Sequence, residues 1–396
     1  MRAWKCPSAA MLAAIIALSC DGGGPPPDPL ADYKREVLAS ITEHAIVGSI
    51  HEFGIAASAM STAVSAYAAD PSDPNRSAAQ DAWREAMEAW ELVEVMQIGP
   101  TGLGGTLGVV GGEGIRDEIY TYEARNTCLL DQETVDQIYL DVEAYAAELV
   151  NVRGLDALEY LLFVESAENT CAAGGRINTE GSWAALDATE IAARRAGLAA
   201  TVATLISREA ARLEAAWSIT DGFGATLSQA GLTGNPFVSA QAGLNEIAGG
   251  MLYLDTDTQD KKLGPPAGIA GCAVASCPDA LEAPHARVDA TLLAANMRAF
   301  QRLYLGDVPG RDALGWDDLL VEVGEAQLAA DLGAAIDAAI AALDALGPSL
   351  ADAIANDMPA VMAAYDAITE ALRLFEVDVF TVLDVEPSGP RIGDND

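Results

Sequence analysis

The chain has 396 residues, of which 22 are basic and 59 acidic, so its formal net charge is −37. A chain this acidic lacks the basic face that nucleic-acid binding requires, and charge would not attract it to anionic lipids. We therefore expect no nucleic-acid partner.

Residues 1–19 have the pattern of an export signal. Arg2 and Lys5 form a short basic start, and residues 11–18 are an apolar run that is too short to span a bilayer. The sequence therefore predicts a signal peptide over 1–19 and a mature protein outside the cytoplasm.

The residues around the expected cleavage point indicate a lipid anchor. The Leu18-Ser19-Cys20 ending resembles a bacterial lipobox, which implies cleavage before Cys20 and attachment of lipid to it. The alternative is an ordinary cleaved signal with an incidental cysteine. Residues 20–30 are rich in Gly and Pro and suit a tether.

We expect a lipoprotein of the cell envelope, periplasm-facing or surface-exposed. Its partners would be the membrane, through the lipid, and an envelope protein.

The rest of the chain has helical periodicity almost throughout. Apolar residues recur at spacings near three and four, and strand-type alternation is scarce. The fold class predicted is all-α, with two packed helical bundles over 31–396, the first over about 31–178 and the second over about 179–386. The expected helices cover residues 33–67, 79–98, 134–150, 152–163, 191–217 and 328–346.

Four cysteines remain after the tether, an even number for an oxidising compartment. We favour disulfides between Cys128 and Cys171 and between Cys272 and Cys277, because each pair lies within one half of the chain. A four-thiolate zinc site is the rival, but no CxxC pair occurs among them, so it ranks lower.

One segment carries a family resemblance. Residues 154–163 read Gly-Leu-Asp-Ala-Leu-Glu-Tyr-Leu-Leu-Phe. They resemble the imelysin family, which is named for an insulin-cleaving metallopeptidase and has a Gly-x-His-x-x-Glu signature followed by an aromatic residue and a Leu-Leu pair. Further segments resemble the family in the same order along the chain, namely 83–100, 116–120, 260–264, 296–304 and 393–396. The resemblance implies two helical bundles with a site between or within them, in exported proteins of which several are linked to iron acquisition.

The sequence departs from that signature at the metal-type histidine, which is Asp156 here. Asp156 and Glu159 are three residues apart, so on a helix both carboxylates project from one face. Such a pair can hold a hard cation through oxygen, and it shifts the preference from zinc towards calcium, magnesium, manganese or ferric iron. Hydrolytic zinc sites mostly use histidines, and only three remain after the signal. The predicted function is binding of a divalent or ferric metal ion or an iron complex, without robust peptidase activity.

Two further residues complete the predicted metal site. Glu94, in a segment that matches the family, can face Asp156 and Glu159. His44 and His51 are seven residues apart on a face that we expect to point inward, because Val37, Ile41 and Ile55 share it. His51 is therefore the candidate imidazole ligand.

Each candidate also has a structural interpretation. The carboxylates can belong to a solvated face, or to a polar network with Arg153, another arginine or a shared proton. The histidines can be satisfied within the core. We expect Arg116 to form a salt bridge and His285 to lie in a surface loop. A metallopeptidase and a structural or partner-binding module remain the alternative functions, so the sequence leaves open whether the protein is an enzyme.

Overall fold

The structure is a computed structural model that describes residues 28–104, 109–121, 125–274 and 276–387. The predicted signal over 1–19, Cys20, most of the tether and the segment 393–396 lie outside these residues. Within them all regular structure is helical, which confirms the all-α class.

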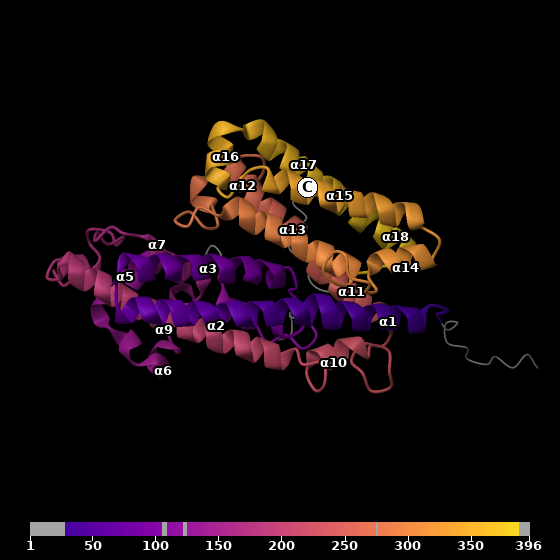
Figure 1. Ribbon diagram of the computed structural model, residues 1–396, viewed down its shortest axis with the longest axis horizontal. Coiled ribbons are helices and arrows are strands. Elements are labelled where there is room, and N and C mark those ends of the chain that lie inside the picture. Colours follow the sequence, from indigo (N-terminus) through magenta and orange to yellow (C-terminus); the bar gives the residue numbers. More distant parts are fainter. Residues whose placement is uncertain (1–27, 105–108, 122–124, 275, 388–396) are drawn as a thin grey trace, which may run out of the picture.

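The first group of helices contains three long ones that lie side by side (Figure 1). Helix α2 (Val47–Ala69) packs against α3 (Asp73–Glu94) and against α9 (Ala188–Ala216). Helix α7 (Leu155–Phe163), which carries the family-like motif, packs against α3 and α9. The shorter elements of this part are α1 (Ala31–Ile41), η1 (Thr42–Ile46), η2 (Gly99–Thr101), α4 (Ile115–Ile119), α5 (Thr127–Asp136), η3 (Ile138–Leu140), α6 (Val142–Tyr145), η4 (Val150–Val152), α8 (Arg176–Thr179) and α10 (Phe223–Ser228).

The second group, orange to yellow in Figure 1, lies along the first and is joined to it mainly through α13 (Asp289–Leu305), which packs on α3. Helix α15 (Ala326–Asp344) packs against α13 and α17 (Met358–Arg373). Although α9 begins after residue 178, its contacts place it with the first group. The other elements here are α11 (Ala240–Met251), η5 (Leu254–Leu263), α12 (Gly264–Ala267), η6 (Pro278–Ala280), α14 (Trp316–Glu322), α16 (Leu350–Asn356), η7 (Leu374–Val379) and α18 (Phe380–Leu383).

Helix α15 is long and apolar enough to cross a membrane by length and composition alone. In the fold it buries Leu332, Ile336 and Leu343 against its neighbours, while Asp331 and Asp337 are exposed. Packing within the bundle therefore accounts for much of its apolar character.

One continuous hydrophobic core runs through both groups. Trp83, Trp90 and Trp217 are buried in it. The Trp83 indole N–H donates to the carbonyl oxygen of Leu155 at 2.8 Å and so fixes the first turn of α7 against α3.

The expectation that His44 and His51 point inward is wrong. Both are exposed, and Nδ1 of His51 pairs with Glu214 on α9 at 2.7 Å. The cause is the π-helical turn η1, which inserts an extra residue between α1 and α2. Thr42, Ala45 and Ile46 are the buried residues of this turn, so His44 lies on its exposed side, and His51 follows on the exposed side of α2.

Both predicted disulfides are confirmed. Cys128 on α5 is bonded to Cys171, 43 residues further along the chain, before α8. Cys272 and Cys277 close a short loop between α12 and η6.

Candidate functional site

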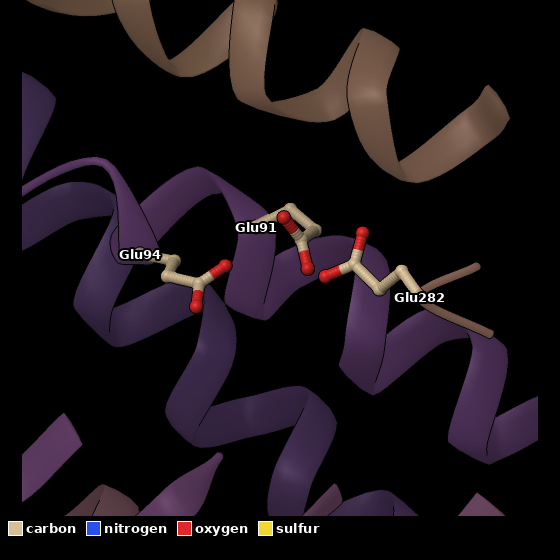
Figure 2. Close-up of side chains that lie close together, drawn as sticks. All are labelled: Glu91, Glu94 and Glu282. Atoms are coloured by element: carbon tan, nitrogen blue, oxygen red, sulfur yellow. The ribbon is translucent and has the colours of Figure 1, made fainter. Parts of the chain in front are cut away.

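A group of buried acidic residues lies where the two helix groups meet. Glu91 and Glu94 are three residues apart near the end of α3, so both face the second group. Glu282 reaches them from the segment between η6 and α13. Figure 2 shows the carboxylates of Glu91 and Glu282 facing each other, with Glu94 further along the same helix. These three residues are called the Glu triad below, and each is at most 5% exposed.

The ammonium group of Lys262, at the end of η5, lies among the three carboxylates. Its Nζ is 2.9 Å from Oε2 of Glu91, 2.6 Å from Oε2 of Glu94 and 2.6 Å from Oε1 of Glu282. The triad has the residue types and spacing to hold a metal ion. Because the Lys262 side chain is fully buried and already supplies a positive charge there, the triad does not need a metal for charge compensation.

Neutral and cationic side chains surround this ion cluster. Arg116 donates to Oε1 of Glu94 at 3.1 Å and also lies 3.5 Å from Oδ1 of Asp117, which is the predicted salt bridge. Asn296 donates to Oε2 of Glu91 at 2.6 Å. Tyr120 donates its hydroxyl to Oε1 of Glu282 at 2.7 Å. Among the described residues, Oε1 of Glu91 and Oε2 of Glu282 have no hydrogen-bond partner.

The local charges set different protonation states for the triad. Burial raises the pKa of Glu91 well above its usual range, and the Glu282 charge adds to this effect. Burial also opposes ionisation of Glu94, but Lys262 and Arg116 outweigh it and hold the pKa of Glu94 below its usual value. The carboxylates likewise outweigh burial at Lys262 and raise its pKa. The surroundings therefore favour the charged forms of Lys262 and Glu94 and the neutral form of Glu91.

Glu159 of the family-like motif is fully engaged by the protein. Its Oε2 accepts from Arg125 at 2.6 Å, and its Oε1 accepts the backbone N–H groups of His285 and Ala286 at 2.8 and 2.9 Å. Burial nevertheless raises its pKa to about 7. Both oxygens are occupied, so this residue is poorly placed to bind a metal or to act as a base.

Asp156 has a different environment. It is 4% exposed, and its Oδ2 accepts a long hydrogen bond of 3.4 Å from the Thr121 hydroxyl. Among the residues that the structure describes, its Oδ1 has no hydrogen-bond partner. Burial raises the pKa of Asp156 to about 7, although the charge of Arg125 opposes this effect. An acidic oxygen without a partner in a buried position is a candidate ligand atom.

Asp156 lines a cavity of about 610 Å³. Tyr120 and Arg125 lie in the same wall, and the segment 276–282 forms much of the rest. Glu282 belongs both to this wall and to the Glu triad, so the cavity and the buried ion cluster share one carboxylate.

The four predicted metal ligands do not form one site. Asp156 and Glu159 remain neighbours on α7, Glu94 lies in the ion cluster with Lys262, and His51 is exposed on α2. His285 lies in an exposed loop, as predicted, and its backbone contacts Glu159. The predicted set therefore does not fit a hydrolytic zinc centre, which normally needs three protein ligands around one ion.

Several important residues were not predicted as part of the site. Glu91 had a visible signal, since it precedes Glu94 by three residues on a helix. Lys262 and Asn296 fall in segments that resemble the family, but nothing in their local sequence predicted a charge cluster. Glu282 and Arg125 lie outside those segments and had no comparable signal.

Comparisons with known proteins agree with this architecture. A sequence model of the imelysin family (peptidase M75) matches residues 51–375. A crystal structure from Parabacteroides distasonis, described as an iron-regulated protein A precursor, has a TM-score of 0.70 at 15% identity and covers 90% of this chain and 96% of its own. An imelysin-like protein from Psychrobacter arcticum has a TM-score of 0.67 at 18% identity, over 91% of this chain and 98% of its own. No curated protein matches significantly.

Proposed function

The chain belongs to the imelysin family, and from this premise we propose that it is an exported lipoprotein that captures a metal ion or a metal complex in its acidic cavity. The observation that carries the proposal is a pair of carboxylate oxygens, Oδ1 of Asp156 and Oε2 of Glu282, that have no hydrogen-bond partner among the described residues and belong to residues that line one cavity. Hard cations prefer such oxygen ligands.

The cellular setting is part of the proposal. The basic and apolar start of the chain and the lipobox-like ending at Cys20 support export and lipid anchoring in the cell envelope. Iron is the metal class that we favour, because a structurally similar protein is described as iron-regulated.

We do not propose a peptidase role. A hydrolytic metal site would need Glu159 as a ligand or base, and both of its oxygens are held by Arg125 and two backbone N–H groups. Metal-dependent cleavage of an unfolded peptide that disappears in Glu159→Gln would contradict this view.

Calorimetry on the mature chain tests the metal proposal. The Cys20→Ser chain, which cannot carry lipid, would be titrated with Mn²⁺ and with Fe³⁺ held in solution by citrate. We expect Asp156→Asn to weaken binding by about tenfold or more, or about 1.4 kcal/mol. Asp366→Asn, at an exposed position on α17, should leave it unchanged. Equal binding by both variants, or no binding by the parent chain, would refute the site.

A further inference from the structure

The cavity is much larger than a bare metal ion requires. Its volume of about 610 Å³ lies within the range of about 300–1,000 Å³ that is typical of small-molecule pockets. A hard metal ion takes about six or more oxygen ligands. Asp156 and Glu282 can supply only part of that number, so waters or the oxygen atoms of a bound chelator must complete the coordination.

The charge of the wall also bears on the ligand. Arg125 lines the cavity beside Asp156, and its charge lowers the pKa of Asp156 against the larger effect of burial. A cation held by Asp156 alone would therefore be repelled by Arg125. A ligand that carries its own carboxylates would instead pair with the guanidinium group.

Apolar side chains complete the wall. Tyr120 and Leu281 line the cavity together with the charged residues, and Val274, which is 67% exposed, adds a further apolar side chain. Such surfaces contact the carbon skeleton of an organic molecule and contribute little to a hydrated ion.

From these three features we propose that the cavity binds a hard metal as a chelate with an organic polycarboxylate, and does not bind the bare ion as its main ligand. Asp156 and Glu282 face the metal or its bound waters, while Arg125 pairs with a carboxylate of the chelator. This inference rests on the proposed metal-binding function and specifies its substrate class.

The test compares three probes by calorimetry on the Cys20→Ser chain: ferric citrate, citrate alone and Mn²⁺ alone. We expect ferric citrate to bind at least tenfold more tightly than either of the others. Arg125→Gln should weaken ferric citrate binding by about tenfold and should strengthen Mn²⁺ binding, because the charge of Arg125 repels a bare cation.

Two further variants separate a loss of ligand binding from a loss of the fold, and test the size of the ligand. Because Arg125 also neutralises Glu159, the double variant Arg125→Gln/Glu159→Gln keeps that pair uncharged. Ala280→Trp places a bulky side chain in the cavity wall and should exclude the chelate while still admitting a small ion. Near-ultraviolet circular dichroism would verify the fold of each variant.

The outcomes separate this inference from the function on which it rests. Mn²⁺ binding that depends on Asp156, with no tighter binding of ferric citrate, would overturn the chelate and leave metal capture intact. Citrate alone binding as tightly as ferric citrate would also overturn it, because the site would then recognise an anion. Failure of all three probes would refute both proposals.

Discussion

Lys262 is the residue on which the buried ion cluster depends. Its ammonium group pairs with all three glutamates, and Arg116 adds a second cation at Glu94. These pairs compensate the charge of the three buried carboxylates. The role of Lys262 in the site is indirect: it holds one oxygen of Glu282, while the other has no hydrogen-bond partner among the residues that the structure describes.

Replacing this lysine should destabilise the fold strongly. In Lys262→Met, Glu94 and Glu282 would lose their shared cation in a buried setting, and breaking a buried ion pair typically costs about 3–5 kcal/mol. The adjacent Lys261 is the matched control: its side chain is 43% exposed and pairs with Asp257, so Lys261→Met should cost less than about 1 kcal/mol. Guanidinium unfolding measures both. Similar losses in the two variants would contradict the role given to Lys262.

At the scale of elements, the register between α1 and α2 depends on the π-helical turn η1. Deleting Glu43, an exposed residue of that turn, would restore a regular helix and rotate one helix by about 100° relative to the other. Either Val37 and Ile41 or Ile46 and Ile50 would then leave the core. We expect the deletion to cost several kcal/mol in urea unfolding, since each large side chain removed from the core contributes about 1.5–3 kcal/mol. Glu43→Ala, the control, should be nearly neutral, and equal effects would argue against the register explanation.

The same turn shows where sequence periodicity stops being informative. The apolar spacing correctly predicted helices over most of the chain, including the region of α1 and α2. It could not show the extra residue at η1, because Thr42–Ile46 contains no proline or glycine to signal an irregularity. The error about His44 and His51 followed from continuing a regular helix through that point.

The two disulfides should have different effects. Cys128–Cys171 joins residues 43 apart, so chain entropy predicts a loss of about 4 kcal/mol when both are changed to Ser. Cys272–Cys277 spans only five positions and should contribute about 2 kcal/mol. Its removal should mainly weaken ligand binding, because Cys277 belongs to the cavity wall. Unfolding and calorimetry on the two double variants test this order, and a larger stability loss from Cys272→Ser/Cys277→Ser would contradict it.

For the whole molecule, the segments that resemble the family meet in space although they are far apart in the chain. Glu94, Arg116, Tyr120, Lys262 and Asn296 come from four of these segments and all join or border the ion cluster. Their order along the chain was sufficient to predict the family and the helical fold. The pairing of Lys262 with the triad was not predictable, because it arises only when the fold brings Lys262 on η5 next to Glu91 and Glu94 on α3. Nor could local spacing show that the guanidinium group of Arg125 pairs with Glu159 and, among the described residues, makes no hydrogen bond to Asp156.

Stability should fall as the pH rises from 5 to 8. A carboxyl group whose pKa is raised by folding stabilises the fold when protonated, so its contribution is present at acidic pH and is lost as the pH passes its folded value. For Asp156 and Glu159 that value is about 7. Self-repulsion within a chain of net charge −37 acts in the same direction. Thermal unfolding at constant ionic strength should therefore show a higher Tm at pH 5.

Asp156→Asn resembles the protonated acid, so it should be more stable than the parent at pH 8 and similar to it at pH 5, whereas Asp366→Asn should differ little at either pH. A parent Tm that rises with pH, or an Asp156→Asn variant that is less stable at pH 8, would show that the Asp156 carboxylate is stabilised by partners and does not offer the unpartnered ligand oxygen inferred from the cavity.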